Sequence, residues 1–308
     1  MFLVDKLFFV GKRMAVIAAL GLLSFGATLH AGANSSSRSN TIAQPAPLPL
    51  NLTVNTLGDA DDLALDGICD TSAAAGEQCT LRAAIQETNF AASDDTIGFS
   101  LAPNSNIILF TALPSIDGNL VINGLGANTM SVRRSSDTGI PDFRVFRINS
   151  GKTVTISGLL IVNGRADSGG GISNAGTLTV NSSEIYNNSS LSNGGGIAND
   201  TTSGPATLNI NNSTIAGNFA LSTGGGIYNF SSANPATVNI NNSTININNT
   251  NFSHGGGIFN SATGGAAATL IINSSTISGN QASISGGSGT GGGIYNEAGV
   301  TLNNTIVE

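Results

Sequence analysis

The second half of the chain repeats itself with a period near 30 residues. The motif Gly-Gly-Gly-Ile-x-Asn occurs five times, starting at Gly169, Gly194, Gly224, Gly255 and Gly291. A second block lies between these copies, and its equivalent apolar residues are separated by 24, 30, 30, 32 and 30 positions. These residues are Val154, Leu178, Leu208, Val238, Leu270 and Val300. A repeat of this length indicates a solenoid rather than a globular fold.

Apolar and polar residues alternate within each block. Leu208 and Ile210 point to one side of the chain while Asn209 points to the other, which is typical of a strand with one buried face. Ile215 marks a second short strand, and Ile227 marks a third. Three short strands per repeat, separated by Gly and Asn turns, predict an all-β fold. The expected architecture is a right-handed parallel β-helix, a three-sided solenoid.

Stacking of the coils at about 4.8 Å aligns equivalent side chains in ladders. An aliphatic ladder is predicted to fill one corner of the interior, with Ile172, Ile197, Ile227, Ile258 and Ile294 as its members. A row of asparagines is expected at the turn that follows, formed by Asn174, Asn199, Asn229, Asn260 and Asn296. Another row contains Asn188, Asn218, Asn248 and Asn280. Segments of variable length are predicted to be recognition loops on the flanks, at residues 198–205, 230–235, 261–268 and 281–291.

The N-terminus has the pattern of a secretory signal peptide. Lys6, Lys12 and Arg13 precede an apolar stretch that ends near small residues, so we predict cleavage after Ala33. About 14 apolar residues fall short of the ~20 that a membrane-spanning helix requires, and no transmembrane helix is expected in the mature chain. The predicted organisation is a signal peptide at 1–33, a flexible leader at 34–50, a cap with irregular coils at 51–150, and regular repeats at 151–308.

Charge and cysteine content limit the partners. After residue 33 the chain keeps 8 basic and 17 acidic residues, a formal charge of −9, so nucleic acid and anionic lipid are not expected as partners. The two cysteines, Cys69 and Cys79, lie ten positions apart. In an exported chain this spacing favours a disulfide over a metal-binding pair.

The best helix pattern after the signal peptide covers residues 80–90. Thr80 can act as the N-cap, and Leu81, Ile85 and Thr88 fall on one face. An amphipathic helix across the first coil would cover the open end of the solenoid. Strand-like runs of the irregular region lie at 52–54, 107–110, 120–122 and 143–148.

A family resemblance supports this organisation. Cys-Thr-Leu-Arg-Ala-Ala-Ile at 79–85 resembles the CSLREA-type motif at the start of many bacterial exported β-helix proteins, and Asp-Gly-Ile-Cys-Asp at 66–70 matches its usual lead-in. The repeats resemble those of chlamydial polymorphic outer-membrane proteins. Together the resemblances cover about residues 52–308 and imply a pectin lyase-like fold, exposure at the cell surface or secretion, and an adhesin-like role. Ala83 replaces the motif's Glu, which removes one half of a capping box.

The same fold occurs in pectate lyases and polygalacturonases, so a polysaccharide lyase or glycoside hydrolase is the alternative. Such enzymes gather carboxylates on one outer sheet, for calcium or as an acid and base pair. The repeat alignment places Asp167, Glu184 and Asp200 at different coil positions, so no catalytic residue is predicted. Asp167 and Arg165 are expected to form a surface ion pair in a loop.

One acidic segment is a candidate calcium site, with a solvated loop as the alternative. It contains Asp59, Asp61, Asp62, Asp66 and Asp70, and its spacing differs from that of an EF-hand loop. His254 is the only histidine after residue 33, so the sequence predicts neither a zinc site nor a Ser-His-Asp triad, and no other cofactor.

These features predict an exported, non-enzymatic, adhesin-like protein of the outer membrane or the extracellular space. Its flank loops are expected to bind a host protein, a neighbouring cell or a glycan. A further coil begins at Val300 without the motif that should follow. We therefore expect the chain to be a fragment of a longer protein, or a partner subunit to cover the open end.

Overall fold

The computed structural model describes residues 48–308, apart from 74–77, 92 and 287. The predicted signal peptide and most of the predicted leader lie outside the described residues. Within the part that is described, no helix combines the length and the apolar character needed to cross a membrane.

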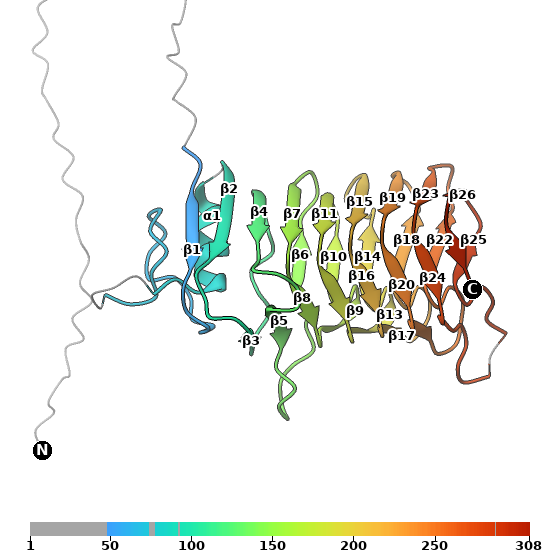
Figure 1. Ribbon diagram of the computed structural model, residues 1–308. Coiled ribbons are helices and arrows are strands. Elements are labelled where there is room, and N and C mark those ends of the chain that lie inside the picture. The colour runs from blue at the N-terminus through green and yellow to red at the C-terminus, as the bar shows by residue number, and fades with distance from the viewer. Residues whose placement is uncertain (1–47, 74–77, 92, 287) are drawn as a thin grey trace, which may run out of the picture. The chain divides into compact units, whose positions relative to one another are not determined.

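The described strands stack in four parallel sheets, which we name A to D (Figure 1). Sheet A contains, in spatial order, β1 (Asn51–Val54), β2 (Asp94–Phe99), β4 (Asn119–Asn123), β7 (Thr153–Ser157), β11 (Thr177–Asn181), β15 (Ala206–Asn211), β19 (Ala236–Asn241), β23 (Ala268–Asn273) and β26 (Gly299–Asn303). Sheet B contains β3 (Ser105–Leu109), β5 (Met130–Arg134), β8 (Leu160–Val162), β12 (Glu184–Tyr186), β16 (Thr214–Ala216), β20 (Thr244–Asn246), β24 (Thr276–Ser278) and β27 (Ile306–Val307). Sheet C contains β6 (Phe146–Ile148), β10 (Ile172–Asn174), β14 (Ile197–Asp200), β18 (Ile227–Ser231), β22 (Ile258–Ala262) and β25 (Ile294–Asn296). Sheet D contains β9 (Arg165–Ser168), β13 (Ser189–Asn193), β17 (Phe219–Ala220) and β21 (Asn249–Thr250).

The register of these sheets follows the repeat. Leu208 pairs with Leu178 in the preceding coil and with Val238 in the following one, and the strands run parallel. Consecutive coils therefore stack as a parallel β-helix, and the predicted fold class is confirmed. The three predicted strands per coil are present in sheets A, B and C. Sheet D adds a fourth, short strand that the sequence pattern did not predict.

Aliphatic side chains fill the interior of the solenoid. Ile197 of sheet C pairs with Ile172 and Ile227 in the neighbouring coils, and all three are fully buried. Ile258 continues this ladder and is also fully buried, while Ile294 at its end is partly exposed. Each buried aliphatic side chain stabilises the fold by roughly 1.5–3 kcal/mol, so the interior ladders supply most of the driving force for folding.

Two asparagine ladders run along the coils. In sheet C, Asn174 donates through its amide nitrogen to the side-chain oxygen of Asn199 at 2.8 Å, and Asn199 donates to Asn229 at 2.9 Å. The row continues through Asn260 to Asn296, and all of its members except Asn296 are buried. The second row, Asn188, Asn218, Asn248 and Asn280, is linked in the same way. Both rows were expected at turns. Their amide nitrogens also donate to backbone oxygens, as Asn174 does to Thr207 at 2.9 Å and Asn188 to Ile161 at 3.0 Å, so both rows satisfy buried backbone groups.

The one described helix, α1 (Leu81–Ala91), packs on β1 and β2 at the N-terminal end of the stack (Figure 1). Its N-cap is the predicted one, because the Thr80 hydroxyl accepts a hydrogen bond from the Ala83 amide at 3.0 Å. The predicted disulfide between Cys69 and Cys79 is formed, and it ties the preceding loop to the start of the helix.

Buried residues of α1 are not confined to the apolar face of the helix. Arg82 and Glu87 are buried together with the apolar residues of the helix. Arg82 forms an ion pair with Asp59 at 2.8 Å and donates to the backbone oxygens of Thr111 and Ala112. The motif's arginine therefore joins the helix to two loops.

Three of the predicted flank loops begin inside strands. Sheet C continues to Asp200, Ser231 and Ala262, because the residues after the buried asparagine still pair with the neighbouring coil. The start of the predicted loops at 198–205, 230–235 and 261–268 was therefore wrong. The segments that lie between strands are 201–205, 232–235 and 263–267, since Ala268 already belongs to β23.

Candidate ligand-binding face

Sheet C presents a column of unusual side chains on its outer face. The variable position of the Gly-Gly-Gly-Ile-x-Asn motif lies next to the same position in each neighbouring coil. In order along the stack the column contains Arg147, Ser173, Ala198, Tyr228, Phe259 and Tyr295. The column thus changes from a cation through small residues to aromatic rings.

The aromatic residues of this column are stacked. The ring centroids of Tyr228 and Phe259 lie 5.4 Å apart, and those of Phe259 and Tyr295 lie 5.3 Å apart. His254 stacks on Tyr295 at 4.4 Å, and its Nδ1 accepts a hydrogen bond from the Thr290 amide. His254, which was predicted to lie in a turn, therefore also packs at the end of this aromatic ladder.

The other end of the aromatic ladder borders a hollow of about 320 Å³, which we call the aromatic hollow. Tyr228 and Phe230, whose ring centroids lie 5.8 Å apart, line it together with Ala198 and Asp200. The residue beside Tyr228 on this side is Ala198, so no ring is stacked there. Burial raises the pKa of Tyr228 to about 12, and the negative charge of Asp200 acts in the same direction.

A second hollow, of about 310 Å³, lies beside the Arg147 end of this column and is lined by residues from 112–115, 142–147 and 166–167. We call it the arginine hollow. Arg144, Arg147, Asp142 and Asp167 are among its lining residues. In the described chain neither Arg144 nor Arg147 forms an ion pair. Burial lowers the pKa of Arg144, the charge of Arg147 lowers it further, and Asp200 and Asp167 oppose the shift. Arg144 therefore lies within electrostatic reach of the carboxylate of the aromatic hollow.

The ion pair expected between Arg165 and Asp167 is not formed. Both residues lie in β9 rather than in a loop, and Arg165 pairs with Asp142 at 3.2 Å. Asp142 also contacts Arg134 at 3.5 Å. The expectation was wrong because it weighed only residues after 151, while the partner of Arg165 comes from the preceding coil.

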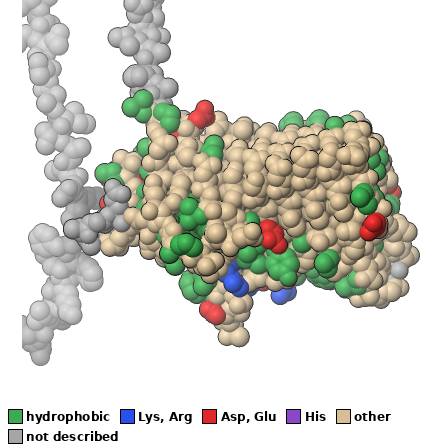
Figure 2. Space-filling model, in the orientation of Figure 1, with side chains coloured by type: hydrophobic (Ala, Val, Ile, Leu, Met, Phe, Trp, Pro, Cys, Tyr) green, Lys and Arg blue, Asp and Glu red, His purple; other side chains and the backbone are tan. Residues whose placement is uncertain are grey.

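Positive charge is concentrated near the arginine hollow. Six of the eight basic residues after position 33 lie between residues 133 and 165, and none follows Arg165. On the face drawn in Figure 2, the Lys and Arg side chains gather along one stretch of the lower edge. An acidic protein thus has one local basic region, and it adjoins the aromatic hollow.

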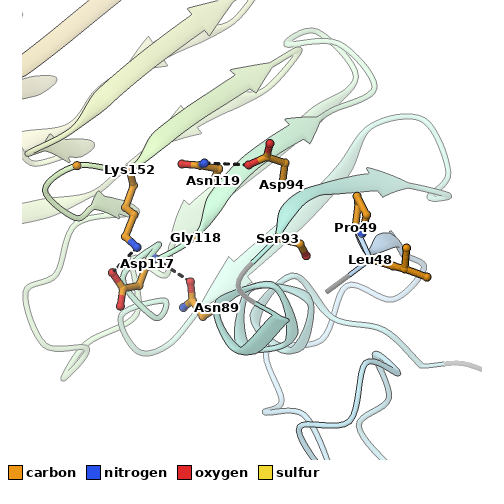
Figure 3. A pocket seen from close by; sticks show the side chains of 10 residues that line it. Leu48, Pro49, Asn89, Ser93, Asp94, Asp117, Gly118, Asn119 and Lys152 are labelled. Atoms are coloured by element: carbon orange, nitrogen blue, oxygen red, sulfur yellow. Dashed lines mark hydrogen bonds and ion pairs between the residues drawn. The ribbon is translucent and has the colours of Figure 1, made fainter. Parts of the chain in front are cut away.

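A hollow of about 700 Å³ near the N-terminal end of the stack is a weaker candidate (Figure 3). Its charged side chains already have partners, since Lys152 pairs with Asp117 at 3.6 Å and Asn119 donates to Asp94 at 2.8 Å. Asn89 accepts from the Asp117 amide at 2.7 Å. Among the described residues no aromatic ring lines this hollow, so its size is not matched by groups that would recognise a ligand.

The acidic segment is organised mainly by bonds within the protein. Asp59 pairs with Arg82, and Asp61 accepts from the Gln86 side chain. Asp62 accepts from the backbone amides of Ala64 and Asp70, and Asp66 accepts from that of Ile68.

Glu87, buried in α1, accepts hydrogen bonds from the amides of Asp66 and Gly67. Burial raises the pKa of Glu87, and the nearby Asp62 carboxylate adds to the rise. Among the described residues no group of three or more His, Cys, Asp or Glu side chains is arranged to hold a metal. Calcium binding at Asp59, Asp61, Asp62, Asp66 and Asp70 stays a prediction.

The acids considered for catalysis lie on three sheets. Asp167 is in β9 of sheet D, Glu184 in β12 of sheet B and Asp200 in β14 of sheet C. The charges of Asp167 and Asp200 nevertheless both act on Arg144, a residue that no sequence pattern indicated. A signal for the aromatic part was present, because the variable position of the motif contains Tyr228, Phe259 and Tyr295.

Comparison with known proteins adds no relative. No protein-family model matches the chain, and no curated protein matches it significantly.

Proposed function

We propose that this protein is an exported, non-enzymatic surface or secreted protein, adhesin-like, that binds a glycan on the outer face of sheets C and D. The observation that carries the proposal is the aromatic hollow. There the half-buried Tyr228 and Phe230 stand beside the carboxylate of Asp200 and the hydroxyls of Thr201 and Thr202.

This combination suits a sugar ring, which has an apolar C–H face and a polar rim. Ligand sites in general combine an apolar or aromatic lining with a few polar groups that fix orientation. An aromatic ring supplies the apolar surface, and Asp200 can accept hydrogen bonds from sugar hydroxyls. The resemblance to exported β-helix proteins supports a location where glycans are accessible.

The proposal is tested by glycan binding to the protein as it is secreted. An array screen identifies a bound glycan, and calorimetry then compares the native chain with Tyr228→Ala and with Tyr186→Ala. Tyr186 in β12 is a matched control because it is exposed on sheet B. We expect about tenfold weaker binding for Tyr228→Ala, from the loss of one ring contact, and unchanged binding for Tyr186→Ala.

Equal losses in both tyrosine variants, or a screen in which no glycan is bound, would contradict the proposal. Circular dichroism spectra recorded before each titration show whether both variants are folded at the titration temperature, and only folded variants are compared.

A polysaccharide lyase or glycoside hydrolase is the second candidate, and one observation favours it. Asp167 and Asp200 lie within electrostatic reach of Arg144, so two carboxylates and a base share one region. Prolonged incubation of the bound glycan distinguishes the two functions. New reducing ends that disappear in Asp200→Asn would establish the enzyme, whereas an intact glycan supports the binding protein.

A further inference from the structure

We propose that the ligand of this face is an anionic glycan, whose carboxylates are bound by Arg144 and Arg147 while a neighbouring sugar ring packs in the aromatic hollow. This inference rests on the proposed function and specifies the chemistry of its ligand. It is carried by the distribution of charge and by the positions of the two hollows.

The first argument is that the two guanidinium groups lack carboxylate partners. Asp142, the acid closest to them along the chain, is already shared between Arg134 and Arg165. Arg144 is half-buried and Arg147 is exposed, and neither has an ion pair among the described residues. A guanidinium fork matches a carboxylate with two parallel hydrogen bonds, so an anionic ligand group is the partner that suits this pair.

Mutual repulsion gives the second argument. The charge of Arg147 acts against the protonated form of Arg144, and burial acts in the same direction. A bound carboxylate would relieve both effects, because it supplies the opposite charge where water is partly excluded. A neutral sugar at this point would leave the repulsion in place.

Spacing gives the third argument. Arg147 and Tyr228 occupy the same column of sheet C, three coils apart, which corresponds to ~14 Å at the usual spacing of strands. The two positions between them are the small, buried Ser173 and Ala198, so no bulky side chain of the column separates the two ends. A ligand that reaches both ends must therefore be a chain of several units rather than a single sugar.

Two acids that form no ion pair with the described residues lie near this face. Asp167 lines the arginine hollow, where its single carboxylate faces the two guanidinium groups of Arg144 and Arg147, and Asp200 lines the aromatic hollow. Asp200 lies at the aromatic end, where a sugar hydroxyl rather than a carboxylate would meet it. Between residues 133 and 167 the chain has six basic residues and three acidic ones, whereas residues 168–308 contain four acidic residues and no basic one. The anionic groups of the ligand are therefore expected to lie at Arg144 and Arg147 and to be absent farther along the stack.

The test compares two ligands on the unaltered protein. The probes are oligosaccharides of uronic acids, each paired with its counterpart in which the carboxylates have been chemically reduced to neutral hydroxymethyl groups. Calorimetry at low and moderate salt is expected to show ~10- to 100-fold tighter binding of the anionic member, with the difference shrinking as salt rises. Equal affinities for the two members would overturn the inference while leaving the proposed function intact.

Variants locate the anionic contact. Arg144→Gln with Arg147→Gln should remove most of the preference for the anionic member, because the neutral member loses much less affinity than the anionic one. Lys152→Gln is the matched control, because it removes a positive charge whose partner is Asp117 in a different hollow.

Three further outcomes would contradict the inference. An equal loss in the Lys152→Gln control would assign the preference to overall charge, and tighter binding of sulfated than of uronic-acid oligosaccharides would refute the carboxylate assignment. Absence of binding to every member, anionic or neutral, would refute the proposed function as well.

Discussion

The buried asparagine ladders predict a large and local dependence of stability on one side chain. Asn218 is fully buried, and its amide nitrogen donates to the Ile185 backbone oxygen at 2.9 Å and to the Asn248 side-chain oxygen at 2.9 Å. Its own oxygen accepts from the backbone and side-chain nitrogens of Asn188, at 3.0 and 3.1 Å. The substitution Asn218→Ala therefore removes a group that connects three coils.

The expected cost follows from the partners that are left behind. Asn218→Ala leaves two donors of Asn188 without the oxygen that they share, inside a region closed to water. Each unsatisfied buried group costs about 1–3 kcal/mol, so we expect a loss of ~3–5 kcal/mol once the small cavity is included. That loss is a large fraction of the stability of a typical domain.

Asn209→Ala is the control for this prediction. Asn209 lies in the same coil but is only half-buried on the outer face of sheet A, where it accepts from Asn239 at 2.8 Å. Water can replace this bond, so we expect a loss below ~1 kcal/mol. Urea denaturation followed by circular dichroism measures both variants. Equal shifts of the midpoint would refute the argument that the ladders satisfy buried backbone groups.

Other predictions follow from strain, from a buried ion pair and from a shifted pKa. Ile247 is 59% exposed and has a φ of 55°, a backbone conformation that is costly for a β-branched residue. Ile247→Gly should therefore raise the thermal midpoint by the equivalent of ~1 kcal/mol, and a lower midpoint would contradict this. Arg82→Gln leaves the buried Asp59 carboxylate without its partner and should cost ~3–5 kcal/mol in urea denaturation, more than Arg147→Gln on the surface. The pKa of Tyr228 lies above its ordinary value of 10.0, so the stability linked to its protonated form is complete below pH 10 and is lost as the pH rises toward 12. Tyr228→Phe should therefore flatten the alkaline end of the stability curve by ~1–2 kcal/mol after allowance for partial exposure, and an unchanged curve would refute the assignment.

The repeat made the fold predictable because each coil contains the same short-range pattern. Alternation at Leu208 and Ile210 indicated the strand and its buried face, and the spacing of equivalent residues indicated the register. The helix was also predictable from local chemistry, since Thr80 supplies the cap. Arg82 and Glu87 were assigned no buried role because their partners come from loops that pack on the helix only in the folded chain.

The binding face was not predictable in the same way. Arg144 and Arg147 lie in the irregular region, where no repeat aligns them with Ala198 or Tyr228. Only stacking of the coils places Arg147 and the aromatic rings in one column of sheet C, with Arg144 beside it in the arginine hollow. The residue at position x of the Gly-Gly-Gly-Ile-x-Asn motif differs from copy to copy, and these differences indicate the binding face. The repeat pattern that predicts the fold depends only on the residues that all copies share.

Tyrosine resonances test the central claim most directly. The chain has three tyrosines and no tryptophan, so fluorotyrosine labelling should give one ¹⁹F signal each for Tyr186, Tyr228 and Tyr295. Titration with a uronic-acid oligosaccharide should shift the Tyr228 signal progressively and leave the Tyr186 signal unchanged. A bound ligand that shifts Tyr186, or that leaves Tyr228 unchanged, would contradict the assignment of the binding face.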